Sequence, residues 1–166
     1  MGILARLFGG VPKTERGGIR LEERDPWEVA PTRDVERFLQ ALPLLAPEGA
    51  IAYFEGTGES HVAKYLREVS VSPAVHVAVG TIWPRPDCYH VPLTITSMEA
   101  LAVFLTKRPA GYFCSHCNVY RDNSVLLQWH DAFTDDPLYI SKAIPADRVA
   151  TFARALGSSY GSTKAG

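Results

Sequence analysis

Three histidines in the second half of the chain are the residues best suited to chemistry. They are His90, His116 and His130, and each falls in a segment with the alternating pattern of a β-strand. Imidazole nitrogens bind Zn²⁺, and three of them leave a fourth position for a water that the metal activates. If these segments are neighbours in one sheet, the three rings predict a zinc site, with a metal-assisted hydrolase as the alternative function.

The opposing interpretation is that these histidines only hydrogen-bond to their neighbours. They lie far apart along the chain, and no HExxH-like spacing ties two of them to one metal ion. Histidines on a half-exposed strand are more often hydrogen-bonded than metal-bound. We therefore expect no resident cofactor, with zinc as the alternative to that expectation.

The cysteines suggest a second, weaker alternative. Cys114 and Cys117 form a C-x-x-C motif that resembles the motif of thiol-disulfide exchange proteins. In those proteins the first thiol lies at a helix N-terminus, where the amides lower its pKa. Here the chain continues as a predicted strand, which removes that stabilisation. The odd count of 3 cysteines and the absence of an export signal favour the reducing cytoplasm.

Apolar spacing predicts the elements that must position these side chains. Helical spacing recurs in four segments, and strand-like patterns recur in six. The expected helices cover residues 34–45, 60–69, 96–107 and 145–157, and the expected strands cover residues 50–55, 75–83, 89–96, 113–121, 124–133 and 138–144. Hairpin turns between the later strands predict an α+β fold, a two-layer sandwich whose mainly antiparallel sheet of 5–6 strands has helices packed on one face.

Strand alternation then assigns side chains to the two faces of this sheet. The bulkier apolar sets face the helices, and a polar, aromatic set faces the other way. That set is His90, His116, Tyr120, Gln128, His130, Tyr139 and Ser141. The phase of strand 113–121 is ambiguous, because a bulge would reverse it. Tyr120, Gln128, His130 and Tyr139 are the predicted ligand-binding residues on this uncovered face.

Composition divides the chain into three parts. Residues 1–30 contain glycines, a proline and many charges and predict a flexible N-terminal arm, whose Ile3, Leu4, Leu7 and Phe8 would share one face of a docking helix. Residues 31–157 predict a single α+β domain, and residues 158–166 predict a loose C-terminal tail.

Charge and hydropathy exclude several classes of partner. The 17 Lys and Arg balance 18 Asp and Glu, which disfavours binding to nucleic acid. No apolar run approaches the ~18 residues that cross a bilayer, so we expect no integral membrane association. The main expectation is a small soluble accessory, inhibitory or immunity-type module, not an enzyme. It would bind a protein or a small molecule through an exposed sheet face.

Overall fold

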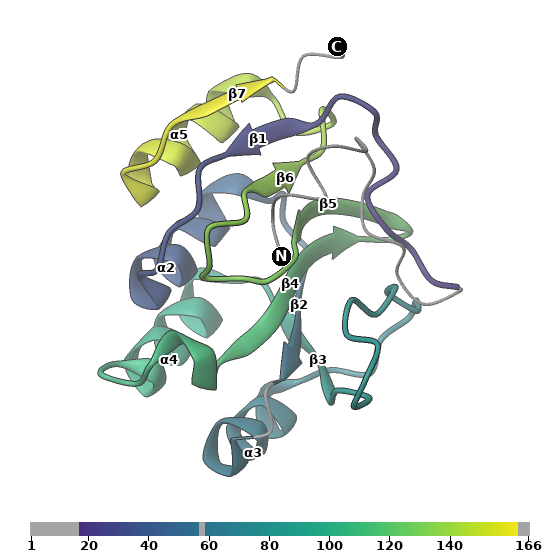
Figure 1. The fold of residues 1–166 in the computed structure, drawn as a ribbon, viewed down its shortest axis with the longest axis vertical. Coiled ribbons are helices and arrows are strands. Elements are labelled where there is room, and N and C mark those ends of the chain that lie inside the picture. Colours follow the sequence, from purple (N-terminus) through teal and green to yellow (C-terminus); the bar gives the residue numbers. More distant parts are fainter. Residues whose placement is uncertain (1–16, 57–58, 163–166) are drawn as a thin grey trace.

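One antiparallel sheet organises the protein. The computed structural model describes residues 17–56 and 59–162, and within them seven strands are ordered β3-β2-β4-β5-β6-β1-β7 (Figure 1). The strands are β1 (Trp27–Val29), β2 (Ile51–Gly56), β3 (Cys88–Pro92), β4 (Cys114–Arg121), β5 (Ser124–Trp129), β6 (Leu138–Ile140) and β7 (Tyr160–Ser162). A two-residue turn at Asp122 and Asn123 joins β4 to β5, as the sequence predicts. The connection from β5 to β6 is longer than expected, because β5 ends at Trp129 and residues 130–137 form an eight-residue loop.

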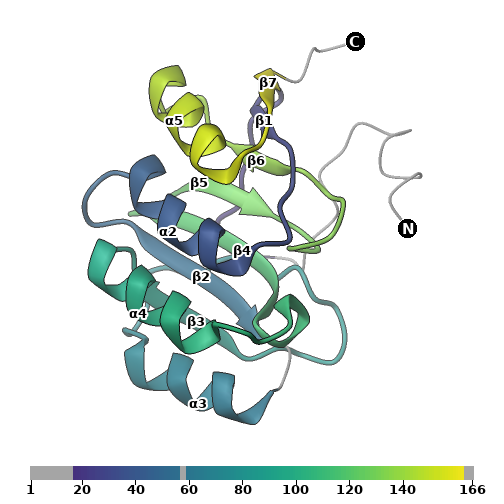
Figure 2. The same cartoon turned by 90° about the vertical axis from the view of Figure 1, so that its left-hand side faces the viewer.

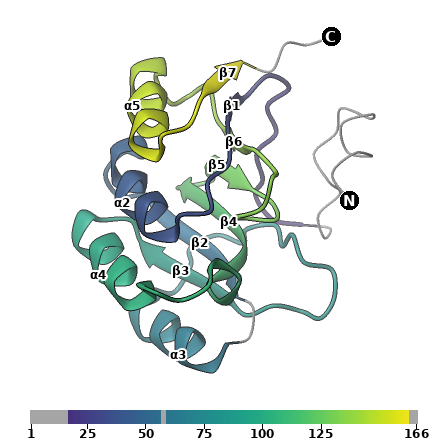
Figure 3. The same cartoon turned by 60° about the vertical axis from the view of Figure 1, so that its left-hand side comes forward.

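The helices all lie on one side of this sheet. Figures 2 and 3 show α2 (Val35–Leu45), α3 (Ser60–Val69), α4 (Ile95–Leu105) and α5 (Ala146–Leu156) as a single layer, and a short 3-10 helix η1 (Ala110–Tyr112) precedes β4. The predicted two-layer α+β arrangement is confirmed. The sheet is larger than the 5–6 strands expected, because both ends of the described chain add a strand.

The added strands correct the expectation for the chain ends. Residues 17–30 are not a free arm, since β1 pairs with β6 and β7, and Val29 is fully buried. Tail residues 160–162 form β7 against β1. The local composition is poor in apolar residues, but the sheet edge supplies backbone hydrogen bonds that isolated polar segments lack. The predicted docking helix of residues 3–8 and tail residues 163–166 lie outside the described residues.

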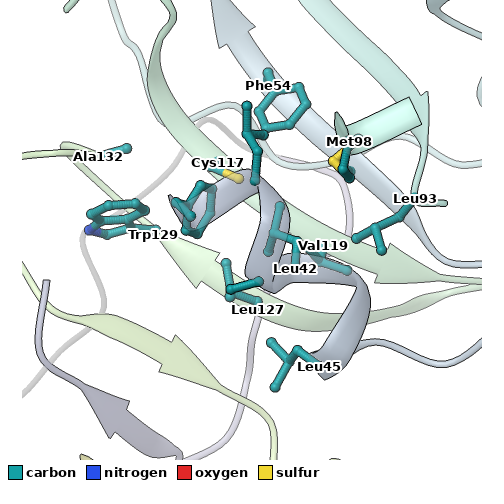
Figure 4. Close-up of a cluster of buried hydrophobic side chains, with 14 of the residues drawn as sticks. Leu42, Leu45, Phe54, Leu93, Met98, Cys117, Val119, Leu127, Trp129 and Ala132 are labelled. Carbon is teal, nitrogen blue, oxygen red and sulfur yellow. The ribbon is translucent and has the colours of Figure 1, made fainter. Parts of the chain in front are cut away.

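The core fills the space between the helices and the sheet. The Asp34 side chain accepts a hydrogen bond from Arg37 N and starts α2. The buried stripe of this helix packs on the sheet through Phe38, whose ring lies 5.0 Å from that of Trp129. Figure 4 shows how helix and strand side chains interlock around Leu42, Val119 and other apolar residues. This apolar layer fixes the orientation of every strand that carries a polar residue on the opposite face.

The predicted strand at residues 75–83 is wrong. Only one isolated parallel bridge, between Ile19 and Val77, forms there, and the segment crosses the helix-free face instead of joining the sheet. Its apolar side chains are buried by packing onto the helix-free face of the sheet. The alternating pattern therefore occurs here without the hydrogen-bond ladder of a strand. Residues 18–24 lie beside it, and we call residues 18–24 and 75–81 together the cover segments.

Two register shifts change which side chains face the helices. Gly56 pairs with Cys114 while Glu55 pairs with His116, so both Cys114 and Cys117 enter the helix-side core. A second shift pairs Tyr120 with Val125 and places Val125 on the helix-free side. Strict alternation with Leu127 would instead place it in the helix-side core. Each bulge inserts one residue and reverses the phase beyond it.

Candidate functional site

A row of polar and aromatic side chains crosses the helix-free face. The register aligns His90, Tyr53, Asn118, Gln128 and Tyr139 on five adjacent strands. The predicted shared face is therefore confirmed for the residues in this row that the sequence singled out. Strands that are distant in sequence meet here because the apolar positions between these residues all point into the helix-side core.

This face is covered, which corrects the expectation of an exposed sheet surface. Leu21 N donates to Gln128 Oε1 at 2.9 Å, and Leu21 packs with Tyr53 and Tyr120 in a second, smaller apolar cluster. Tyr120 and Gln128 are buried, and Tyr139 is half-buried. None of the helices in residues 17–56 and 59–162 lies on this side (Figure 2). Extended chain takes the place of a helix there and brings backbone amides to the polar side chains.

Glu55 lies at the centre of a second polar row. Its carboxylate is 0% exposed and accepts hydrogen bonds from Gly80 N at 2.6 Å and Thr81 N at 2.9 Å. The Tyr53 hydroxyl donates to the same carboxylate at 3.2 Å. Two backbone amides and a phenol thus satisfy the hydrogen-bonding needs of a buried carboxylate. Among the described residues, no cation forms an ion pair with it.

The carboxylate also affects its neighbours electrostatically. Burial raises the pKa of Tyr53 far above its usual value, and the negative charge of Glu55 raises it further. Burial likewise raises the pKa of Cys88, whose Sγ lies 3.1 Å from the Tyr53 hydroxyl. These groups remain protonated at neutral pH and act as hydrogen-bond donors. They are not prepared nucleophiles.

His116 and His130 lie beside this carboxylate as a pair. Their ring centroids are 5.2 Å apart. Asp131 N donates to His116 Nδ1 at 3.0 Å. Because Gln128 Oε1 already accepts from Leu21 N, the Gln128 amide nitrogen donates to His130 Nε2. Each ring therefore uses one nitrogen as an acceptor.

Burial, and to a smaller extent the neighbouring His116, lowers the pKa of His130 to about 4. The pKa of His90 is also lowered by burial, and its Nδ1 lies 2.9 Å from the Tyr120 hydroxyl. Desolvation disfavours the imidazolium in both places. At neutral pH these histidines serve the hydrogen-bond network as uncharged rings.

This geometry does not assemble the predicted zinc ligands. His90 on β3 is three strand spacings from the end of β5, which His130 directly follows, about 14 Å at the usual strand separation. The acceptor lone pairs of His116 and His130 are occupied by N–H donors. Within residues 17–56 and 59–162, no three His, Cys, Asp or Glu side chains gather closely enough to hold a metal ion.

The C-x-x-C thiols lie in the helix-side core. Cys114 and Cys117 are free, fully enclosed by apolar side chains, and burial raises the pKa of both thiols. A thiol that is protonated and inaccessible is a poor nucleophile for disulfide exchange. The predicted loss of a helix N-terminus also agrees with the position of both residues on β4.

Next to Glu55 and its bonded amides, a loop exposes two large apolar side chains to solvent. Ile82 is 83% exposed and Trp83 is 86% exposed. The segment between α3 and β3 that carries them loops out on the side of the sheet away from the helices (Figure 3). We call residues 82–86 the tip loop. Large apolar side chains that are this exposed and adjacent are typical of interaction surfaces.

Both ends of the tip loop are held by the end of β2. Glu55 binds the amides of Gly80 and Thr81 before the loop. Gly56 N donates to the Asp87 carbonyl at 2.9 Å after it. A Cβ at Gly80 would lie 2.8 Å from the His116 ring, so the loop base lies directly on that imidazole. The buried polar residues therefore fix the base from which Ile82 and Trp83 project.

Sequence reasoning missed the central position of Glu55. Alternation in strand 50–55 places Tyr53 and Glu55 on the face opposite Phe54, a signal that would have set a carboxylate beside His116. Trp83 ends the predicted strand 75–83, which the structure replaces with a segment that crosses the sheet. Its exposure depends on the path of residues 75–81, which local sequence does not encode.

Comparisons with known proteins leave the function to be argued from this geometry. The chain matches no family model, no curated protein and no solved structure. Among the helices in the described part of the chain, none has the length and apolar character needed to cross a bilayer.

Proposed function

We propose that the protein is a small non-catalytic binding module that recognises a protein partner through the tip loop. The observation that carries this proposal is the exposure of Ile82 and Trp83 on a loop whose two ends are fixed by Glu55 and Gly56. Tryptophan is among the residues that contribute most to binding energy at protein interfaces. The proposal is an accessory, inhibitory or immunity-type role.

The fixed loop base supports recognition because it lowers the entropic cost of binding. A loop that is already held in one conformation loses less freedom when it docks. Tyr120, Gln128, His130 and Tyr139, expected to touch a ligand, contribute to the covered face that supports this base. In this proposal they act as supports and the tip loop makes the contact.

The proposed partner is a protein and the proposed compartment is the cytoplasm. The balance of 17 basic and 18 acidic residues gives no general attraction to nucleic acid. Free cysteines at positions 88, 114 and 117 suit a reducing compartment.

A random-peptide phage library selected on the immobilised full chain tests the proposal. We expect enriched peptides whose affinity falls about 30-fold or more in Ile82→Ser/Trp83→Ser, since an anchor of this kind contributes at least about 2 kcal/mol. Val103→Ser is the matched control, because Val103 is 75% exposed on the helix side. It should bind the same peptides as the parent chain.

The fold must survive these substitutions for the comparison to be valid. Both variants remove only exposed side chains, so their unfolding free energies should stay within about 0.5 kcal/mol of the parent. Enriched peptides that bind the double variant as well as the parent would overturn the tip loop as the binding surface. Zinc bound stoichiometrically by the purified chain, measured by elemental analysis, would favour the hydrolase instead.

A further inference from the structure

The tip loop carries an unbalanced positive charge beside its apolar pair. Arg85 is exposed, and no carboxylate of residues 17–56 or 59–162 lies within ion-pair distance of it. The nearest acidic residue in sequence, Asp87, pairs with Arg67 at 3.5 Å. Its hydrogen bond from Tyr89 engages the same carboxylate oxygen. The loop therefore presents two apolar side chains followed by a cation that no carboxylate in the described part of the chain neutralises.

From this arrangement we infer that the partner surface is an apolar pocket bordered by carboxylates. This inference rests on the proposed function and specifies the chemistry of its partner. Ile82 and Trp83 would fill the pocket, and the Arg85 guanidinium would meet an Asp or Glu at its border. The planar guanidinium matches a carboxylate with two parallel hydrogen bonds, which adds direction to the apolar contact.

Charge disfavours a second copy of this chain as the occupant. In a two-fold symmetric contact, the same patch of each subunit meets its symmetry mate. Two tip loops packed in this way would bring Arg85 near the Arg85 of the second copy. Like charges without a neutralising carboxylate repel each other at close range, so self-association through the tips is opposed.

A lipid bilayer is also a poorer match than a protein. Stable attachment to a membrane surface needs two signals, such as an acyl chain with a polybasic patch. The tip loop offers a single cation, worth about 1 kcal/mol against anionic lipid. A protein pocket, in contrast, can enclose the indole on all sides and remove it from water.

The composition of the selected peptides tests this inference. From the phage library described above, we expect the parent chain to select peptides that combine large apolar residues with Asp or Glu. We expect Arg85→Glu to weaken these peptides about tenfold and to select Lys- or Arg-containing peptides in their place. Arg154→Glu on α5, also at an exposed arginine, is the control and should keep the acidic selection.

Each other outcome has a defined meaning. Peptides that need Trp83 but are neutral, and are unaffected by Arg85→Glu, overturn the acidic partner and leave the proposed function intact. Absence of any peptide that depends on Trp83 overturns both. Trp83-dependent sedimentation with phosphatidylcholine/phosphatidylserine vesicles overturns the inference in favour of a bilayer. A concentration-dependent dimer that Trp83→Ser abolishes, measured by analytical ultracentrifugation, overturns it in favour of self-association.

Discussion

The two faces of the sheet are covered by different kinds of structure. On one face, four helices bury an apolar layer that includes Phe38 and Trp129. On the other, extended chain covers a row of polar side chains and contributes amides to Glu55 and Gln128. Helices cannot supply such donors from their middle turns, because those N–H groups are already bonded. Extended cover segments are thus suited to a polar face, and they leave a loop projecting from it.

The largest expected effect lies on the helix-covered face. Phe38→Ala removes a fully buried ring that packs against Trp129, Phe133 and Phe152. We expect the unfolding free energy to fall by about 4 kcal/mol, through lost burial and the cavity that remains. Urea unfolding followed by circular dichroism measures this, with Val103→Ala as the exposed control. A loss below about 1.5 kcal/mol would contradict the tightly packed core.

The next effect probes the polar face. Glu55→Ala leaves the amides of Gly80 and Thr81 without their acceptor, and we expect a loss of about 3 kcal/mol in unfolding free energy. Hydrogen exchange at these two amides should accelerate, because the tip loop loses one of its anchors. Glu55→Gln keeps one acceptor oxygen and should lose less.

Glu99→Ala is the matched control for this measurement, since Glu99 is an exposed carboxylate on α4. It should change the unfolding free energy by less than about 0.5 kcal/mol. If Glu55→Ala behaves like Glu99→Ala, the carboxylate does not organise the loop base and the contrast between the faces is lost.

The smallest effect is a dependence on pH that belongs to the polar face alone. The pKa of His130 is lowered from 6.5 to about 4, so the unfolded chain binds more protons than the folded chain between these values. The stability that depends on an uncharged His130 is present above the pKa of this histidine in the unfolded chain. It is lost as pH falls toward the pKa of His130 in the folded chain. We expect unfolding free energy to drop by about 2 kcal/mol between pH 7.5 and pH 5.

Denaturant unfolding across this pH range, repeated with His130→Gln, measures the contribution of this ring. The variant should flatten the slope between pH 6.5 and 5. An equal slope in His130→Gln and the parent would show that His130 is not held neutral by its surroundings.

Sequence patterns predicted the helix-covered face well and the polar face in part. Apolar residues at helical spacing identified the segments of α2 and α5, because this spacing directly marks the helix face that becomes buried. Alternation also placed His90 and Gln128 on the shared polar face. It failed at residues 75–83 and at Val125, where a segment crosses the sheet and a bulge shifts the register.

Amino-acid order alone determined which side chains need burial and hence the two-layer architecture, since apolar periodicity is a local property. Only the tertiary structure decided what covers the polar face, because the amides that reach Glu55 and Gln128 come from segments 25 and 107 residues away. Hydrogen-bond donors on the backbone are common to almost every residue, so no side-chain pattern reveals which of them will meet a buried carboxylate. That long-range choice sets the path of the loop and brings Ile82 and Trp83 to the surface.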